Sequence, residues 1–394
     1  MLGHVDHGKT SITKCLTGKW TDTHSEEIKR GISIRIGYAD VVLKKCPNCP
    51  EPECYTREEK CAKCGTKAEA LRTISILDAP GHETLMTTAI AASSIMDGAI
   101  LVIAANEECP QPQTLEHLTV LEVLGVKHIV VVQNKVDLVP REKSLENYHQ
   151  IKKFLKGTVA ENAVIIPFVA NKCANVDALM AAIDKHIPTP KRNLETSPKM
   201  YVARSFDVNK PGTEISKLEG GVVGGSLIEG KVKVGDELEL RPGIIISEKG
   251  KQEKARPLKV IVERIFAGNE KLQEAGPGGL IAVGTSLDPS LTKSDRVVGN
   301  LLGKPSDMPP IVSEINLEFS FLKRIDLESS SMKHMEPLVL SIGTATAIGF
   351  VEGSKKNVLH LKLKRPICLL PGSKMAVSRR IGNRWRLAGY GTAK

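Results

Sequence analysis

The sequence lacks long hydrophobic runs and is poor in aromatic residues. No apolar stretch approaches the roughly 18 residues that predict a membrane span, and we expect no membrane partner. Only 4% of the residues are aromatic, which disfavours stacking of nucleic-acid bases as the main mode of binding. The segment from Met1 to Lys9 does not resemble a secretion signal. We therefore expect a cytoplasmic protein.

The cysteine pattern argues against a disulfide framework. The count of nine is odd, and four cysteines form two tight pairs, which favours reduced thiols with one metal site in a reducing cytosol. Cys15, Cys109, Cys173 and Cys368 look like isolated small apolar residues. The net charge is +10, from 55 Lys and Arg against 45 Asp and Glu. This surplus fits either a polyanionic partner such as nucleic acid or a basic surface without a specific partner.

The length of 394 residues predicts two or three domains. Residues 1–190 alternate apolar runs with helix-like stretches, and runs such as 98–105 and 128–132 lack the alternation of a half-exposed strand. Such runs suit a parallel sheet that is buried on both faces. We predict a doubly wound α/β domain with a mostly parallel sheet.

The pattern changes after the polar, proline-rich stretch His186 to Pro190. Short strand-like runs separated by glycine turns then dominate, for example at 222–240 and 358–363. A second break falls in the proline-rich stretch 304–310. We therefore expect two all-β barrels, at 196–304 and 310–394.

Gly3 to Thr10 matches the phosphate-loop pattern G-x-x-x-x-G-K-[ST]. Glycines let backbone N–H groups surround a phosphate, and the end of the following helix adds a favourable dipole. Lys9 would neutralise the β and γ oxygens, and the Thr10 hydroxyl would bind Mg²⁺. Taken alone, the match also fits chance or an ATP site.

Two further segments are candidates for sensing the γ-phosphate. Asp78 follows an apolar run and would hold Mg²⁺ through water, while the Gly81 N–H would face the γ-phosphate. The alternative is an ordinary turn after a strand. Gly31 to Ile34 is a candidate switch loop in which Ser33 supplies a second hydroxyl to Mg²⁺, although a plain solvated loop fits as well.

Asn134-Lys135-Val136-Asp137 follows another predicted strand. A carboxylate at Asp137 can accept hydrogen bonds from the guanine N1–H and 2-amino group, which adenine does not offer in that arrangement. Asn134 can bond the ring N7, and the stem of Lys135 can cover the ring face. Third in order along a parallel sheet, this motif predicts a guanine nucleotide, GTP or GDP.

Two C-x₂-C pairs, at Cys46 and Cys49 and at Cys61 and Cys64, are separated by 11 residues. Four thiolates so spaced can close a tetrahedral Zn²⁺ site, and the polar loop between them has no core of its own. Unrelated free thiols are the alternative. Cys54 lies inside the loop and is a possible rival ligand.

Several longer stretches resemble the gamma subunit of translation initiation factor 2 of archaea and eukaryotes, and the resemblance runs the whole length. The stretches that carry it are Lys29 to Ala39, Asn106-Glu107 with Pro110 to Thr114, Arg204 to Gly212, Gly220 to Ser226, Pro277 to Thr285 and Ser378 to Leu387. The resemblance implies a three-domain protein built like elongation factor Tu. Within the family, archaeal members fit best, because they carry a zinc knuckle.

The resemblance implies a GTPase that carries methionylated initiator tRNA to the small ribosomal subunit and assembles with alpha and beta subunits. It implies that alpha docks on the second domain and beta on the GTPase domain. By the same analogy His82 would position or polarise the attacking water. The nucleotide-binding residues it implies are Asp6, His7, Gly8, Lys9, Thr10, Ser11, Gly81, Asn134, Lys135, Asp137, Val169, Ala170 and Asn171, and it adds Asp6 and Gly31 to the magnesium contacts.

The sequence departs from the family pattern at three places. Ser33 stands where the family usually has threonine, and Val169-Ala170 replaces a Ser-Ala pair that supports the guanine O6 contact. Only Met1 and Leu2 precede Gly3, where the family has a buried strand. We expect a miscalled start or a truncated record, or alternatively an inactive copy, and a core opened by the missing central strand.

Two other classes of GTPase compete with this interpretation. One is a GTPase that drives a metabolic enzyme, as in the large subunit of sulfate adenylyltransferase, and the other is a selenocysteine-type elongation factor. The cysteine pairs and Lys29 to Ala39 speak against the first. In the third domain, Arg379, Arg380, Arg384 and Arg386 fit contacts to tRNA phosphates, but salt bridges to barrel carboxylates are favoured because Trp385 between them reads as a core residue.

Overall fold

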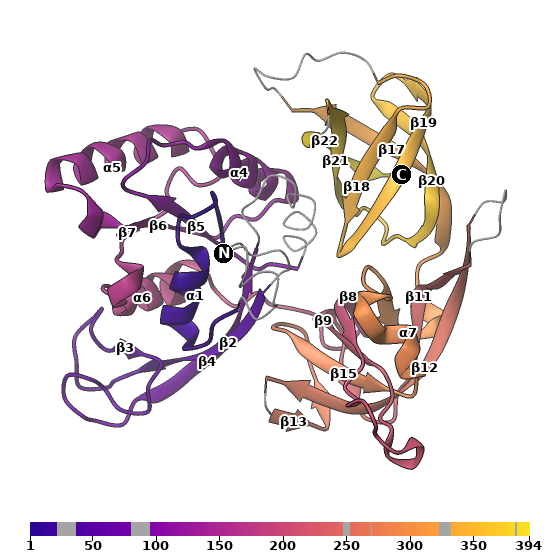
Figure 1. Ribbon diagram of the computed structural model, residues 1–394, viewed down its shortest axis with the longest axis horizontal. Coiled ribbons are helices and arrows are strands. Elements are labelled where there is room, and N and C mark those ends of the chain that lie inside the picture. Colours follow the sequence, from indigo (N-terminus) through magenta and orange to yellow (C-terminus); the bar gives the residue numbers. More distant parts are fainter. Residues whose placement is uncertain (22–36, 80–94, 247–252, 269, 323–331, 383) are drawn as a thin grey trace. The chain divides into compact units, whose positions relative to one another are not determined.

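The computed structural model describes residues 1–21, 37–79, 95–246, 253–268, 270–322, 332–382 and 384–394. The chain divides into two compact units, Met1–Pro190 and Lys191–Lys394, which are described separately below (Figure 1).

The first unit is built on a four-stranded parallel sheet of order β1-β5-β6-β7. All residues of β5 and β6 are buried, and both strands are rich in branched aliphatic side chains, as expected of strands covered on both faces. The predicted parallel sheet is thus confirmed. Its strands are β1 (Leu2–Gly3), β5 (Ala99–Ala104), β6 (Ile129–Asn134) and β7 (Ile165–Pro167).

A strand does precede the phosphate loop, which corrects the expectation of a missing central strand and an open core. Leu2 and Gly3 form β1 and pair with Leu101 and Val102 of β5. The Met1 nitrogen donates to the Leu77 carbonyl at 2.6 Å. Met1 and Leu2 are 5% and 1% exposed, so both apolar side chains before the phosphate loop are buried.

A second, antiparallel sheet of order β3-β2-β4 lies beside the first. It contains β2 (Gly37–Lys45), β3 (Tyr55–Thr56) and β4 (Glu69–Asp78). The Ala79 N–H donates to the Met1 carbonyl at 3.2 Å, so the chain just after β4 is hydrogen-bonded to the chain just before β1. This junction places the end of β4 next to the phosphate loop.

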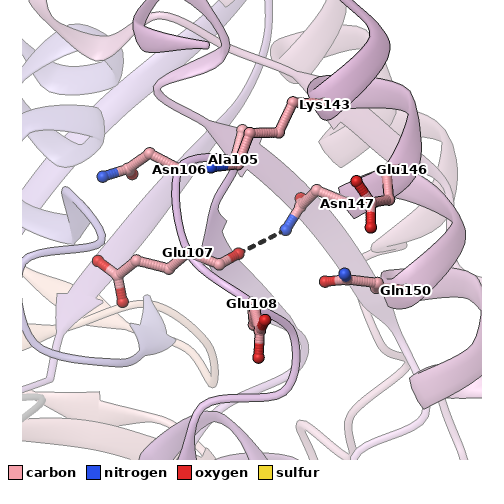
Figure 2. Close-up of a pocket in the computed structure, with 8 residues that line it drawn as sticks. All are labelled: Ala105, Asn106, Glu107, Glu108, Lys143, Glu146, Asn147 and Gln150. Carbon is pink, nitrogen blue, oxygen red and sulfur yellow. Dashed lines mark hydrogen bonds between the residues drawn. The ribbon is translucent and has the colours of Figure 1, made fainter.

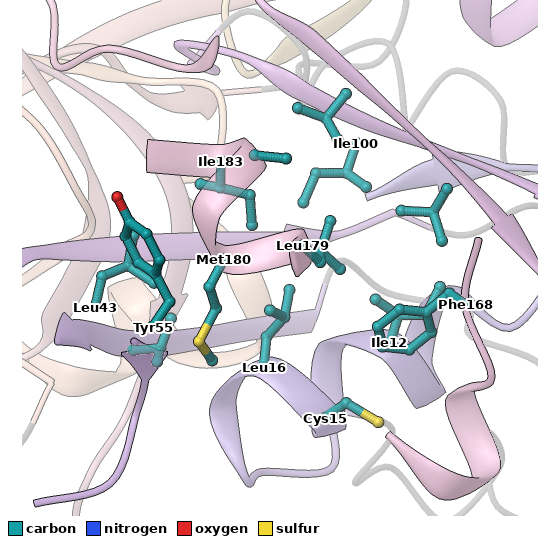
Figure 3. Close-up of a cluster of buried hydrophobic side chains, with 14 of the residues drawn as sticks. Ile12, Cys15, Leu16, Leu43, Tyr55, Ile100, Phe168, Leu179, Met180 and Ile183 are labelled. Carbon is teal, nitrogen blue, oxygen red and sulfur yellow. The ribbon is translucent and has the colours of Figure 1, made fainter. Parts of the chain in front are cut away.

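Four helices of the described chain pack around these sheets (Figure 1). The first, α1, begins at Lys9 of the phosphate loop and is capped at its end by Gly18, whose φ of 77° suits a helix C-terminus. Ile12 and Leu16 of α1 lie in the same buried cluster as Phe168 and Leu179 (Figure 3). The helices are α1 (Lys9–Thr17), α4 (Pro112–Leu124), α5 (Arg141–Leu155) and α6 (Val176–His186), and short 3₁₀ turns span Val136–Leu138 and Ala170–Lys172.

The second unit contains two barrels, as predicted. The first closes through pairing of β11 with β12 and has the strand order β11-β16-β8-β9-β15-β12, with β13 added at β12. Its elements are β8 (Lys199–Phe206), β9 (Val222–Glu229), β10 (Val232–Lys233), β11 (Glu237–Ile246), β12 (Lys254–Ala267), β13 (Glu270–Leu272), β14 (Glu274–Ala275), β15 (Ile281–Thr285), α7 (Pro289–Thr292) and β16 (Leu301–Gly303).

The second barrel closes in the order β17-β20-β19-β18-β21-β22. Arg379 on β21 pairs with Glu336, with Nη2 3.2 Å from Oε2, which supports the structural interpretation for this arginine. Trp385 is only half-buried, so its prediction as a core residue was wrong, whereas Leu387 two residues further on is buried. The strands are β17 (Ile311–Phe321), β18 (Pro337–Ile342), β19 (Ala345–Lys355), β20 (Val358–Cys368), β21 (Lys374–Ile381) and β22 (Arg384–Ala393).

Among the helices of the described residues, none has both the length and the apolar character needed to span a membrane.

Candidate functional site

The phosphate loop joins β1 to α1 and turns at Gly8. Gly8 has a φ of 92°, and a Cβ built on it would lie 2.3 Å from Asn134 Nδ2. Only glycine fits both this conformation and this approach. Gly8 is the N-cap of α1 and offers no side chain to cap it, and half-buried Thr10 and Ser11 lie in the first turn of the helix. This cradle fits a phosphate group.

Lys9 is the first residue of α1 and is 7% exposed. Its ammonium group donates to the His4 carbonyl at 2.7 Å. The positive charge is therefore held across the mouth of the loop rather than extended into solvent, which is where an anionic phosphate chain would be neutralised.

The ring of His7 points into the protein. It is fully buried, with Nδ1 3.0 Å from the Val102 carbonyl and Nε2 3.3 Å from Glu107 Oε2. Burial lowers the pKa of His7, while the Val102 carbonyl and the nearby Glu107 carboxylate oppose that shift. His7 thus meets the loop through its backbone, and its side chain anchors the loop to β5 and to Glu107.

A second histidine, which the sequence did not single out, supports the loop. His117 on α4 is 1% exposed, and its Nδ1 accepts the Gly3 N–H at 2.8 Å. Burial lowers its pKa to about 3, so the ring is neutral and remains an acceptor at Nδ1. The contact joins residues 114 positions apart, and nothing in the spacing of the sequence indicates it.

Asp78 ends β4 beside the phosphate loop and is 1% exposed. Its Oδ2 accepts the Thr21 hydroxyl at 2.8 Å, whereas Oδ1 has no hydrogen-bond partner within the described part of the chain. A buried carboxylate oxygen without a hydrogen-bond partner is costly, and it suits a hydrated divalent cation. The residues present therefore fit Mg²⁺.

Asn134 ties the guanine-binding segments to the phosphate loop. Its Nδ2 donates to the His7 carbonyl at 2.8 Å, and its Oδ1 accepts the Ala170 N–H at 3.1 Å. The side chain is 1% exposed. The structure therefore brings Asn134, the phosphate loop and Val169-Ala170-Asn171 together, although they are far apart in sequence.

Asp137 lies in the 3₁₀ turn after β6 and is exposed, so its carboxylate is accessible for a base contact. Lys135, just before it, has a φ of 63°. This left-handed turn ends the strand abruptly and separates buried Asn134 from accessible Asp137. The four-residue motif thereby places one side chain inward and another outward.

Four predicted site residues, Gly31, Ser33, Gly81 and His82, lie outside the described residues. The residues predicted to sense the γ-phosphate therefore remain predictions, as does the role of His82 in hydrolysis.

A cavity of about 230 Å³ adjoins the site behind Glu107 (Figure 2). The Asn147 amide donates to the Glu107 carbonyl at 2.8 Å and its oxygen accepts from Gln133 at 2.9 Å. These bonds position the segment that holds His7. The cavity is lined by Ala105, Asn106, Glu107, Glu108, Lys143, Glu146, Asn147 and Gln150.

The four paired cysteines gather in one cluster. Their sulfur atoms all lie within 4.8 Å of one another, with Cys46 and Cys64 Sγ 3.4 Å apart and Cys49 and Cys61 Sγ 3.6 Å apart. Hydrogen bonds from Thr66 help to lower the pKa of Cys64 to about 6. Four converging sulfurs fit tetrahedral Zn²⁺.

Cys54 is not part of this cluster. It is fully buried in the apolar core, and burial raises the pKa of its thiol. The rival-ligand interpretation of Cys54 therefore finds no support within the described structure, where its sulfur packs with apolar side chains.

Cys15 and Cys173 are joined by a disulfide, with their Cα atoms 5.4 Å apart. The prediction that both are isolated apolar residues was therefore wrong, and so was the expectation of reduced thiols at these two positions. They are separated by 158 positions, and only the packing of α1 against the turn at Ala170–Lys172 brings them together.

Comparison with known proteins then decides the family. The family model "Elongation factor Tu GTP binding domain" matches residues 1–189, and "Initiation factor eIF2 gamma, C terminal" matches residues 313–393. Translation initiation factor 2 subunit gamma of Methanococcus maripaludis is 56% identical over 99% of this chain and 96% of its own length. The chain belongs to the translation initiation factor 2 gamma family. The corresponding proteins of Methanocaldococcus jannaschii and Pyrococcus abyssi are 54% and 53% identical over the whole chain.

This gamma-family chain is therefore a translational GTPase that binds GTP and GDP, and it acts in translation initiation. The family assignment sets aside the rival interpretations as a sulfate-activating GTPase or a selenocysteine elongation factor. The fold is nevertheless shared with selenocysteine elongation factors. A bacterial selenocysteine-specific elongation factor has a TM-score of 0.75 at 26% identity, covering 99% of this chain and 57% of that one. The elongation factor SelB of Methanococcus maripaludis, crystallised with a GTP analogue, has a TM-score of 0.73 at 23% identity.

Proposed function

We propose that this GTPase binds methionylated initiator tRNA in its GTP form and delivers it to the small ribosomal subunit, where hydrolysis of GTP releases it. The observation that carries the proposal is the identity of 52–56% to gamma subunits of translation initiation factor 2 along nearly the entire chain. The net charge of +10 is consistent with an RNA partner.

We further propose that different residues of the nucleotide site bind the phosphates and the base. Asp6, Gly8, Lys9 and Ser11 cradle the phosphates with the backbone of His7, while Asp137 and the Val169-Ala170-Asn171 turn read the base with Asn134 and Lys135. The support is that the Asn134 side chain donates to the His7 carbonyl and accepts the Ala170 N–H, while Gly8 lies against the same amide. Gly81 senses the γ-phosphate, and His82 positions the attacking water.

Magnesium, when bound, neutralises charge on the β and γ oxygens. We propose that Thr10, Ser33 and Asp78 hold it, with Asp6 and Gly31 alongside. The Asp78 oxygen beside the phosphate loop, which finds no hydrogen-bond partner among the described residues, supports this assignment.

As a gamma-family member, the chain is one subunit of a multisubunit initiation factor. We propose that an alpha subunit docks on the second domain, residues 196–304, and a beta subunit on the GTPase domain, residues 1–190, with residues 310–394 forming the third domain. We also propose a cytoplasmic location, which a role in translation initiation supports.

The test is retention of charged tRNA by the purified chain, together with its alpha and beta partners, in the presence of GTP analogue or GDP. We expect methionylated initiator tRNA to bind about tenfold or more tightly with the GTP analogue, because a switch must differ in affinity between its two states. Methionylated elongator tRNA is the matched control. Equal retention with both nucleotides would exclude the carrier role.

We also predict one zinc ion per chain at the cysteine cluster. Elemental analysis of protein purified under reducing conditions should give a ratio close to one, and Cys61→Ser should reduce it strongly because a thiolate ligand is lost. Cys109→Ser, which removes a half-buried cysteine outside the cluster, is the control and should keep its zinc. A wild-type preparation without bound metal would refute the predicted zinc site.

A further inference from the structure

We propose that Cys15 and Cys173 form a reversible redox site that controls how fast guanine nucleotide leaves this GTPase. The inference rests on the nucleotide site proposed above. It concerns two cysteines that lie outside the zinc cluster and outside every motif of the nucleotide site.

The two cysteines connect the two halves of that site. Cys15 lies on α1, the helix that starts with Lys9 and Thr10 of the phosphate loop. Cys173 follows the 3₁₀ turn Ala170–Lys172, which carries part of the guanine-binding segment. The bond between them therefore links the phosphate side of the pocket to the base side.

The sulfurs lie directly against the base-side turn. Cys15 Sγ is 3.0 Å from the Ala170 carbonyl oxygen, and the Cys173 N–H donates to the same oxygen at 3.3 Å. The Ala170 N–H in turn donates to Asn134, which holds the phosphate loop at His7. The Cys15–Cys173 disulfide is therefore compatible with the hydrogen bonds that join the phosphate side of the pocket to the base side.

Accessibility suits a two-step exchange. Cys173 is exposed, whereas Cys15 is 6% exposed beneath it and packs in the core with Ile12 and Phe168 (Figure 3). An external reagent meets Cys173 first, and Cys15 is within reach as the resolving partner. An exposed thiol with a neighbouring resolving cysteine is the usual arrangement of redox-responsive pairs.

The chemistry balances with a small-molecule disulfide as oxidant. The Cys173 thiolate attacks one sulfur of that disulfide, which leaves a mixed disulfide and releases one thiol. The Cys15 thiolate then attacks the Cys173 sulfur and displaces the second thiol. Two protein thiols are oxidised by two electrons, one external disulfide is reduced to two thiols, and a dithiol reverses the process.

Oxidation should slow nucleotide release. For the guanine to leave, the turn at Ala170–Lys172 must move away from α1, and a covalent bond between them resists that movement. After reduction the turn is held by non-covalent contacts, such as the Ala170 N–H to Asn134 hydrogen bond at 3.1 Å and the packing of Ala170 against the buried cluster. We expect dissociation of GDP to be about fivefold or more slower in the oxidised protein, within the range typical of coupled sites.

The experiment measures dissociation of fluorescently labelled GDP from the full chain after treatment with oxidised glutathione or with dithiothreitol. Mass spectrometry of alkylated peptides reports the fraction of linked Cys15 and Cys173, and zinc content is measured in both samples. We expect Cys173→Ser to release GDP at the rate of the reduced wild type under both conditions. Cys109→Ser is the matched control and should keep the redox response.

The proposal is overturned if oxidant leaves Cys15 and Cys173 unlinked, if the linked protein releases GDP as fast as the reduced one, or if Cys173→Ser still responds. Because Cys173 is exposed, the Cys173→Ser variant should fold even if the Cys15→Ser variant does not. Failure of every form to bind GDP would instead refute the proposed nucleotide site, so the two failures are distinguishable.

Discussion

Gly8→Ala is expected to weaken GTP binding by roughly 100-fold or more. The new Cβ would lie 2.3 Å from Asn134 Nδ2, so either the loop or the Asn134 side chain must move. Moving Asn134 breaks its bonds to the His7 carbonyl and the Ala170 N–H, and a loss of about 3 kcal/mol corresponds to this factor. Equilibrium titration with a fluorescent GTP analogue measures the change.

The control for Gly8→Ala is Gly157→Ala. Gly157 has a similar positive φ of 76°, but a Cβ there meets nothing within 4 Å. This variant should show only the modest destabilisation that alanine incurs in a left-handed conformation, about 1 kcal/mol, and should bind GTP normally. Normal GTP binding by Gly8→Ala would mean that the loop tolerates a side chain and that the cradle has been placed wrongly.

Asp137→Asn is expected to shift base preference from guanine toward xanthine nucleotides. An asparagine presents an N–H where the carboxylate presented an acceptor, so it clashes with the guanine 2-amino group and accepts hydrogen bonds less well from N1–H. Xanthine carries an oxygen at that position and pairs with the new donor. GTP affinity should fall by about 100-fold or more, as a site built around a hydrogen bond rejects a ligand that leaves it unpaired.

Competition between GTP and XTP on the same preparation gives the ratio of affinities directly. Glu142→Gln, an exposed carboxylate in the first turn of the neighbouring helix α5, is the control for loss of one negative charge and should leave the ratio unchanged. If Asp137→Asn bound GTP as tightly as the wild type does, base recognition would have to come from another residue.

Local sequence determined much of this protein, because the patterns concerned are short. Three features depend only on neighbouring residues and can be predicted from the sequence: the buried runs of β5 and β6, the glycine and lysine of the phosphate loop, and the cysteine pairs. The change to short strands after Pro190 likewise indicated two barrels. The long resemblance supplied the family, which comparison over nearly the full chain then established.

Tertiary structure alone decided the contacts between distant segments. The bond from Gly3 to His117, the tie from Asn134 to Ala170 and the link from Cys15 to Cys173 join residues 114, 36 and 158 positions apart. These residues come into contact only when the helices pack on the sheet, and no local sequence spacing predicts the contacts. The same packing buries Met1 and Leu2, because their burial depends on the elements that surround them.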